Sequence, residues 1–299
     1  MILVAGGTGR LGKLIVQLLV RAGEDVRVLT RLQERASGLP VAVEMIVGDI
    51  RRATGVATAV RDCTTVISAV HGFAGPDSPS PEAIDRDGNR RLIRAAKEAG
   101  VEHFVLVSVH DASPDHPMSL HRAKYAAEQE LRASGLGFTV VRPTAFLETW
   151  VSVIGRELRT KGQALVFGPG KNLINFVSVL DVAALVALCV RDRSVSNEVL
   201  DIGGPENLNF VALADQLIRA SGKPGRIKHI PLPVLRVMSV LARPFSPIFA
   251  RQARAAVVMN TTNMAFDASL RERFPTVPST TLADVLASPR ESRPLQSRG

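Results

Sequence analysis

The segment Gly6-Gly7-Thr8-Gly9-Arg10-Leu11-Gly12 connects a short apolar run at residues 2–5 to an amphipathic stretch at residues 10–22. A strand, a glycine-rich turn and a helix in this order are typical of a dinucleotide-binding turn. Separate glycines allow a tight bend, close approach of the backbone to a pyrophosphate, and close packing of the helix on the strand. Free amides at the helix start then face the phosphates. The residues that we expect to bind the dinucleotide here are Gly6, Thr8, Gly9, Arg10, Leu11 and Gly12.

The same segment fits most of a second phosphate-binding motif. Residues Gly7 to Lys13 read G-x-x-x-x-G-K, the beginning of a nucleoside-triphosphate P-loop. That motif continues with Ser or Thr, whose hydroxyl binds magnesium. Leu14 stands at this position and has no hydroxyl. The sequence therefore favours a dinucleotide over a nucleoside triphosphate.

The first half of the chain alternates short β-branched runs with longer helical patterns, which indicates a parallel sheet with crossover helices. We expect strands at 2–5, 25–30, 42–47, 65–69, 103–108 and 138–142, and helices at 10–22, 53–60, 83–99 and 119–134. After Pro143 the pattern becomes irregular, with helical stretches near 148–160, 178–190, 208–221 and 233–243. The predicted fold class is α/β, a Rossmann doubly wound parallel sheet with a smaller α-rich C-terminal substrate-side portion.

The same patterns predict how the chain is divided. Residues 1–145 together with 176–192 are expected to form the NAD(P)-binding Rossmann domain. Residues 146–175 and 193–287 are expected to form the substrate-side portion, packed on one side of the sheet. Residues 288–299 are polar and rich in Arg and Pro, so they are predicted to be a disordered tail.

Composition excludes several classes of protein. The 299 residues are 46% hydrophobic and 22% charged, which rules out a disordered or fibrous chain. Cys63 and Cys189 are far apart, so they form neither a disulfide framework nor a metal-ligand pair, and the histidines lack the spacing of a metal site. The first residues run directly into the glycine turn, and no run of about 18 apolar residues occurs. We therefore expect a cytoplasmic protein without a bound metal.

The residue after the second predicted strand distinguishes the two common dinucleotides. An NAD site generally carries Asp or Glu there, whereas an NADP site carries a basic residue for the 2′-phosphate. Arg31 stands at this position and offers a planar, permanently charged group, so we expect NADP, with NADPH preferred over NADH. The alternative for Arg31 is a solvated surface arginine. Further cofactor contacts are expected from Asp49, which can accept from the adenine amino group or cap a turn, and from Ile50, Ala69, Val70 and Pro143.

Several other motifs carry a family resemblance. They are Asp87-Gly88-Asn89, Ala95-Ala96-Lys97-Glu98-Ala99-Gly100-Val101, Val105-Leu106-Val107-Ser108, Ser134-Gly135-Leu136-Gly137-Phe138-Thr139-Val140-Val141-Arg142-Pro143, Phe176-Val177-Ser178-Val179-Leu180-Asp181-Val182-Ala183 and Asp201-Ile202-Gly203-Gly204-Pro205-Glu206. Together with the glycine turn, they resemble an atypical short-chain dehydrogenase/reductase over nearly the whole chain. The chain is most similar to NmrA-like and isoflavone-reductase-like proteins and to the Rossmann-type accessory subunit of respiratory complex I.

The resemblance implies a functional lysine at Lys124. In the family a Tyr stands four residues earlier on the same helix face, and it transfers a proton while the lysine holds the nicotinamide ribose. Here Leu120 occupies that position, and Tyr125 lies about 100° round the helix from Lys124. Isoflavone-reductase-like relatives also lack the tyrosine, so Lys124 is expected as ribose anchor and proton donor, assisted by His110 or His121. The alternatives are a lysine that only holds the cofactor and histidines that are merely polar loop or helix-start residues.

The net charge of +9, from 37 basic and 28 acidic residues, is concentrated in one segment. Residues 216–266 contain no Asp or Glu. We interpret this segment as a surface for an anionic membrane, as a wall that admits an apolar substrate such as a quinone, or as an ordinary basic exterior. Nucleic acid is not expected, because the chain has one Trp, one Tyr and no recognition motif.

The sequence thus predicts an NADP(H)-dependent oxidoreductase that reduces a small apolar carbonyl or quinone without the usual tyrosine. The first alternative is a non-catalytic NAD(P)-binding redox sensor, regulator or assembly factor, which the loss of the tyrosine supports. A third reading is a sugar-nucleotide epimerase or dehydratase, but such relatives generally keep the tyrosine. A small-molecule substrate and a monomer or homodimer are expected.

Overall fold

The chain folds around one seven-stranded parallel sheet. The computed structural model describes residues 1–73, 79–267 and 270–287, so the predicted tail at 288–299 lies outside the described residues. The strand order is β10-β6-β5-β4-β1-β2-β3, and every pair is parallel. This is a Rossmann sheet, as predicted. Its strands are β1 (Ile2–Ala5), β2 (Val26–Thr30), β3 (Glu44–Val47), β4 (Thr65–Ser68), β5 (His103–Val107), β6 (Gly137–Pro143) and β10 (Glu198–Ile202).

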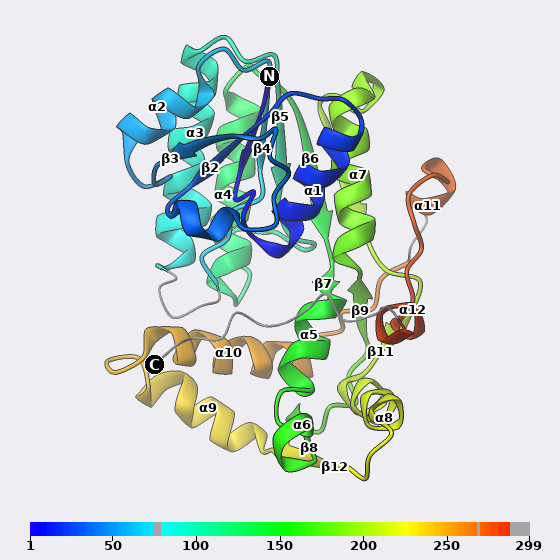
Figure 1. Cartoon of the computed structure of the whole chain (residues 1–299). Helices are drawn as coiled ribbons and strands as arrows, with labels where there is room; N and C mark the ends of the chain where they lie inside the picture. The colour runs from blue at the N-terminus through cyan, green and yellow to red at the C-terminus, as the bar shows by residue number, and fades with distance from the viewer. Residues whose placement is uncertain (74–78, 268–269, 288–299) are drawn as a thin grey trace.

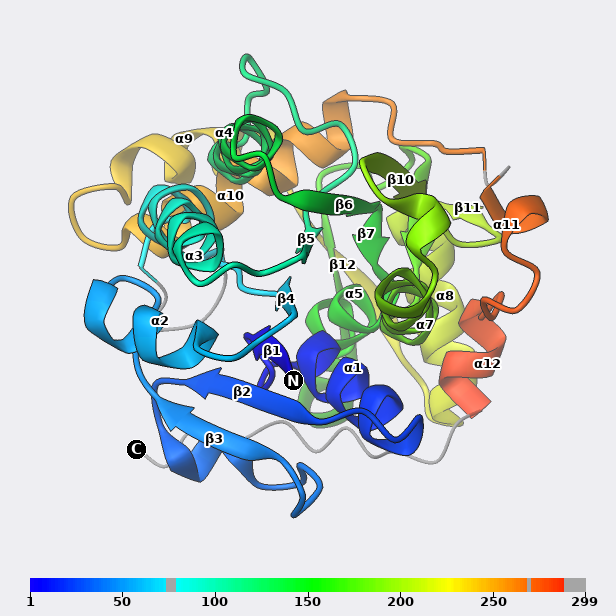
Figure 2. The ribbon, with the colours of Figure 1, turned by 90° about the horizontal axis from the view of Figure 1, so that it is seen from above.

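Helices cover both faces of the sheet, which explains why its strands are apolar throughout (Figure 2). One face carries α2 (Ala53–Val60), α3 (Asp87–Glu98) and α4 (Ser119–Ala133), and the other carries α1 (Arg10–Arg21) and α7 (Val179–Arg191). Fully buried side chains fill both layers, for example Ile15 and Leu19 of α1 on one face and Leu92 of α3 on the other. Each such side chain contributes about 1.5–3 kcal/mol. Three further short elements lie along these connections: η1 (Gln33–Ala36), η2 (Glu82–Arg86) and η3 (Arg193–Val195).

The remaining residues form a smaller portion with its own core, which centres on Phe176 and Phe210. The sequence predicts a single helix near 148–160, but the structure divides it into α5 (Leu147–Ile154) and α6 (Leu158–Lys161), with Gly155 between them. The helix α11 (Leu270–Arg273) lies beside β10 of the main sheet. The smaller portion also contains α8 (Phe210–Ser221) and α12 (Leu282–Ala287), with five strands that the sequence did not reveal. They are β8 (Gln163–Phe167), which pairs with β12 (Arg226–Ile230), and β7 (Ala145–Phe146), β9 (Ile174–Val177) and β11 (Asn207–Leu208).

Two adjacent helices lie beyond the carboxyl ends of the sheet (Figure 1). They are α9 (Leu232–Leu241), which the sequence predicts, and α10 (Pro247–Thr261), which it does not. Ser246 caps α10 by accepting from the amide of Phe249. Two arginines of α10 donate to loop carbonyls of the Rossmann portion: Arg251 to Gly72 at 3.2 Å and Arg254 to Pro117 at 3.0 Å. None of the helices among the described residues has the length and apolarity needed to cross a membrane.

Candidate cofactor and active site

The glycine turn fits a pyrophosphate because side chains are excluded from it. Gly6 has a φ of +86°, and a Cβ there would lie 2.7 Å from the carbonyl oxygen of Ala69. A Cβ on Gly12 would lie 2.1 Å from the carbonyl oxygen of Gly6, so the helix packs directly on the turn. Gly9 is the N-cap of α1, and its amide donates to Gly6 at 3.0 Å. A glycine N-cap leaves the first amides of α1 without a side-chain acceptor, which suits a bound phosphate.

Three charged side chains lie at the ends of β2 and β3, where the adenosine end of a dinucleotide is expected. Arg31 is exposed directly after β2. Asp49 follows β3, and both of its oxygens accept from Arg51, whose Nε lies 3.0 and 2.9 Å away. The hydrogen bond from Arg51 lowers the pKa of Asp49, and the charge of Arg31 adds to this effect. Arg51 was not identified from the sequence, where only its place two residues after Asp49 could have suggested it. Ile50 is buried and lies against Gly88, so its side chain forms part of the apolar wall of this region.

Lys124 is held at the centre of the same edge by three oxygens. Its Nζ donates to the carbonyls of Val70 at 2.9 Å and Val107 at 2.8 Å, and it lies 3.0 Å from Oδ1 of Asp85. Both side chains are buried, with exposures of 4% for Lys124 and 0% for Asp85. The other carboxylate oxygen of Asp85 accepts from the amide of Gly72 at 2.8 Å. Two N–H groups of the ammonium therefore donate to backbone carbonyls, and the Asp85 carboxylate lies beside the cation as an ion pair.

Asp85 is the important residue that sequence reasoning missed. It lies in η2, a single π-helical turn before α3, and such turns are common at functional sites. The wider turn is continuous with α3, and Asn89 of that helix donates back to the carbonyl of Asp85 at 2.7 Å. The only sequence signal was its position two residues before the Asp87-Gly88-Asn89 motif.

The other predicted cofactor residues lie between the glycine turn and the substrate side. Ala69 follows β4 and faces Gly6, and Val70 presents its carbonyl to Lys124. Both are half-buried. Pro143 ends β6, is buried, and accepts from the amide of His110 at 2.9 Å. The sheet edge thus brings the glycine turn, Ala69, Val70 and Lys124 together, while Pro143 lies two strands beyond β4, at the end of β6.

His110 lines a polar cavity of about 530 Å³ at the ends of β6 and β10. Its Nδ1 lies 2.7 Å from Oδ1 of Asp201, and its ring stands edge-on to Phe266 at 4.8 Å between centroids. Asp201 therefore fixes the orientation of the imidazole, a group that can either donate or accept a proton. Arg142 lines the same cavity.

Two further side chains lie near this cavity: a histidine that is neutral and a serine whose hydroxyl is already hydrogen-bonded. His121 stacks on His116 with 3.8 Å between ring centroids, and burial, followed by the charges of His116 and His110, lowers the pKa of His121 to about 3. Its imidazole is thus neutral at neutral pH and does not act there as an imidazolium acid. Ser108 donates its hydroxyl to Glu128, which also accepts from Nε of Arg142 at 2.9 Å. The serine therefore points into a buried polar cluster.

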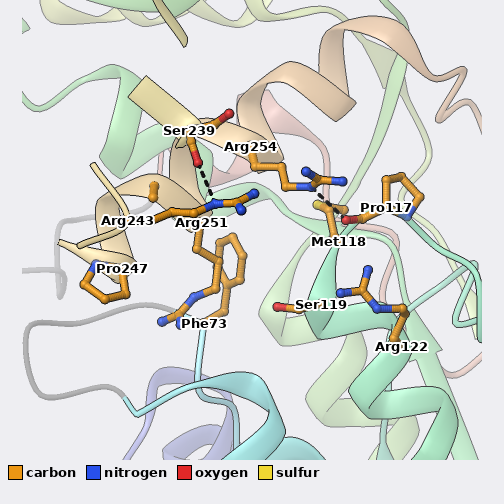
Figure 3. Close-up of a pocket in the computed structure, with 11 residues that line it drawn as sticks. Phe73, Pro117, Met118, Ser119, Arg122, Ser239, Arg243, Pro247, Arg251 and Arg254 are labelled. Atoms are coloured by element: carbon orange, nitrogen blue, oxygen red, sulfur yellow. Dashed lines mark hydrogen bonds between the residues drawn. The ribbon is translucent and has the colours of Figure 1, made fainter. Parts of the chain in front are cut away.

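A second cavity, of about 400 Å³, lies between the start of α4 and the pair α9–α10 (Figure 3). Pro117, Met118, Ser119 and Arg122 line one side of it, and residues of α9, α10 and the turn between them line the other. Among the described residues, no group of three or more His, Cys, Asp or Glu side chains could hold a metal ion. Cys63 and Cys189 are buried and unpaired with each other.

Fold and site together define the class: a Rossmann protein with a dinucleotide-binding turn at the carboxyl edge of its sheet and a buried lysine beside it. Residues 6–193 match the family model described as NAD(P)H-binding. The chain belongs to this NAD(P)H-binding family, and the predicted resemblance to atypical, NmrA-like short-chain dehydrogenases/reductases is confirmed.

Relatives in this family have different roles. The NAD(P)H azoreductase of Xenophilus azovorans is 30% identical over 235 residues, which cover 78% of each chain. The photosystem II assembly factor Ycf39 of Synechocystis is 28% identical over 258 residues, 85% of this chain and 78% of the relative. An NADPH-dependent quinone oxidoreductase of Escherichia coli, solved with NADPH, shares the fold with a TM-score of 0.78 at 19% identity, over 96% of this chain and 98% of that one.

Proposed function

We propose that the protein is an NADP(H)-dependent reductase of a small apolar carbonyl, quinone or azo compound. The observation that carries this proposal is the buried Lys124, held beside Val70 and Val107 between the glycine turn and the substrate-side cavities. A buried cation at this edge, fixed by three oxygens, suits a group that positions a ribose and a reacting ring. The azoreductase relative and the shared fold of the quinone oxidoreductase support reduction as the chemistry.

The chain's own residues divide the binding work along the sheet edge. The amides that begin α1 bind the pyrophosphate, and Arg31 with Arg51 binds a 2′-phosphate, which favours NADPH over NADH. NADPH, when bound, supplies the hydride. Lys124 holds the nicotinamide ribose, for which one of its present acceptors gives way. Ile50, Ala69, Val70 and Pro143 bound the space around the two rings.

Proton delivery is proposed to differ from that of tyrosine-containing relatives, because Leu120 occupies the tyrosine position. Quinones and azo compounds accept hydride with less help from a dedicated acid than simple ketones require. His110, oriented by Asp201, is the group with access to the polar cavity and is proposed to deliver the proton. Lys124 is the alternative donor.

Turnover with a panel of substrates tests the proposal. NADPH oxidation is followed with quinones, azo dyes and aldehydes, for the wild type, Lys124→Ala and the adjacent Tyr125→Phe. We expect turnover that Lys124→Ala reduces at least about tenfold and Tyr125→Phe leaves within about twofold. Unchanged turnover in Lys124→Ala would remove the role of this lysine. Tight NADPH binding with no turnover on any substrate would favour the assembly-factor or sensor alternative.

The alternative role has one observation in its favour, an exposed apolar surface on α9 and the turn after it. Val237, Leu241 and Phe245 are 53%, 64% and 89% exposed, and residues 216–266 are basic and free of acid. We propose that this surface contacts an anionic membrane. Flotation of the protein with phosphatidylglycerol vesicles should then be lost in Leu241→Ser/Phe245→Ser. It should be kept in Val41→Ser, which changes a fully exposed apolar residue distant in sequence from this surface. Equal binding to phosphatidylcholine vesicles would remove the electrostatic part of this proposal.

A further inference from the structure

The cavity beside α10 is unusually rich in arginine. Four guanidinium groups line it, and Phe73, Met118 and Pro247 supply apolar wall (Figure 3). Three of the arginines lie on the α9–α10 side and one lies at the start of α4 across from them. Residues 247, 250, 251 and 254 are spaced so that they share one face of α10, which explains how a single helix contributes a whole wall. The four arginines are Arg122, Arg243, Arg251 and Arg254.

None of these four arginines is paired with a carboxylate among the described residues. Each donates instead to a backbone carbonyl: Arg122 to His116, Arg243 to Ser239, Arg251 to Gly72 and Arg254 to Pro117. A carbonyl satisfies an N–H group but leaves the positive charge in place. None of the described residues that line the cavity is acidic. The acids that act on Arg251 from outside it are Glu82 and Asp85, and Asp85 is already paired with Lys124.

Arg251 shows most clearly that a partner is lacking. Its Nε is buried and has no hydrogen-bond acceptor in the part of the chain that the structure describes, and burial lowers the pKa of the guanidinium. A buried N–H group without an acceptor is unfavourable, because it has lost its hydrogen bond to water. An anionic oxygen in the cavity would satisfy this atom and offset the charge at the same time.

The cavity is connected to the proposed reaction centre through one residue, Gly72. The carbonyl of Gly72 accepts from Arg251, and its amide donates to Asp85, which holds Lys124. The hydrogen bonds of Gly72 therefore join Arg251 of the cavity to Asp85, the partner of Lys124. The volume of about 400 Å³ falls in the usual range for small-molecule sites.

We propose that this arginine pocket binds the carboxylate or sulfonate of an aromatic substrate, so that the enzyme prefers acidic quinones or azo compounds over neutral ones. The inference rests on the proposed reductase function and adds the charge of the substrate to it. Arginine side chains pair bidentately with planar carboxylates and also with tetrahedral oxyanions such as sulfonates, while Phe73 and Met118 contact the ring. A lipid phosphate shares the anionic chemistry and is the source that the test must separate.

Matched substrates test the pocket. The kcat/KM values of 1,4-naphthoquinone and 1,4-naphthoquinone-2-sulfonate are compared in the wild type, in Arg243→Gln/Arg254→Gln, and in Arg236→Gln, an exposed arginine of α9 outside the cavity. We expect the double variant to lose at least about tenfold on the sulfonate relative to the neutral quinone, and Arg236→Gln to change this ratio less than about twofold. An unchanged ratio in the double variant overturns the proposal. Added NaCl should raise the wild-type KM of the sulfonate more than that of the neutral quinone.

A binding measurement separates the pocket from the reductase function. Calorimetry with naphthalene-2-sulfonate, which is not reducible here, is run on the wild type and the same variants. Binding that the double variant loses supports the pocket even if no quinone turns over, whereas turnover without any such binding overturns the pocket and leaves the reductase standing. If the double variant instead loses binding to phosphatidylglycerol vesicles but keeps naphthalene-2-sulfonate, the arginines serve a lipid headgroup and the substrate proposal fails.

Discussion

The cofactor edge and the arginine pocket are proposed to hold charged ligands in opposite ways. The glycine turn works through backbone amides, and its geometry depends on side chains being absent at Gly6 and Gly12. The pocket works through four long side chains from three separate segments, each held by a backbone carbonyl. A site of the first kind tolerates almost no substitution, whereas a site of the second kind can lose one member and keep part of its affinity. The following changes test this contrast.

The largest effect is expected at the glycine turn. In Gly12→Ala the new Cβ would lie 2.1 Å from a backbone oxygen that cannot move without opening the turn. We expect the dissociation constant of NADPH to rise by at least about 100-fold. The control is Gly23→Ala at the other end of α1, which has open space around it and a φ of +83°, so only a backbone penalty of about 1–2 kcal/mol applies. Titration by fluorescence and denaturant unfolding separate the two, and intact binding in Gly12→Ala would contradict the steric argument.

The second effect concerns the ion pair between Lys124 and Asp85, which is linked to the arginine pocket through Gly72. Lys124→Met leaves Asp85 charged and buried, so the free energy of unfolding should fall by about 3–5 kcal/mol. Adding Asp85→Asn should recover much of this stability without restoring turnover, because the amide oxygen can still accept from Gly72. Denaturant unfolding and NADPH oxidation are measured on both variants. A double variant as unstable as the single one would show that the charge of Asp85 is not the cause.

The third effect concerns cofactor choice, where a side chain and not the backbone makes the contact. Arg31→Ala should weaken NADPH binding about 10- to 100-fold, the loss of one charge-assisted hydrogen bond, and leave NADH nearly unchanged. Arg21→Ala, an exposed arginine at the end of α1, removes the same charge elsewhere. Parallel weakening of both dinucleotides in Arg31→Ala would assign this residue to general electrostatics.

The fourth effect is a pH dependence of the free energy of unfolding. Burial lowers the pKa of His103 to about 4 and that of His121 to about 3, from an ordinary value of 6.5. Between pH 6.5 and about 4 the unfolded chain binds these protons and the folded chain does not, so stability falls as the pH falls. Each histidine contributes up to about 1.4 kcal/mol per pH unit. The slope measured by denaturant unfolding should be smaller in His103→Gln, and an identical slope would exclude His103 as a source.

What could be predicted from the sequence follows the same contrast. The sheet, its flanking helices and the glycine turn depend on local patterns, and the six strands predicted in the first half lie within two residues of the observed bounds. The strands β8 and β12 begin their pairing at Gln163 and Arg226. These two residues are too far apart in the chain for a local pattern to reveal the pairing. Asp85 and the arginine pocket were missed for the same reason, because each residue acquires its role only from neighbours distant in the chain.

Gly72 is hydrogen-bonded to both sites. Its carbonyl and amide bond to Arg251 and Asp85 at the same time, so a displacement that improves one contact changes the geometry of the other. Any factor by which an anion at Arg251 alters dinucleotide affinity must equal the factor by which the dinucleotide alters affinity for the anion. Gly72 is therefore a direct route by which the two proposed ligands can affect each other's binding.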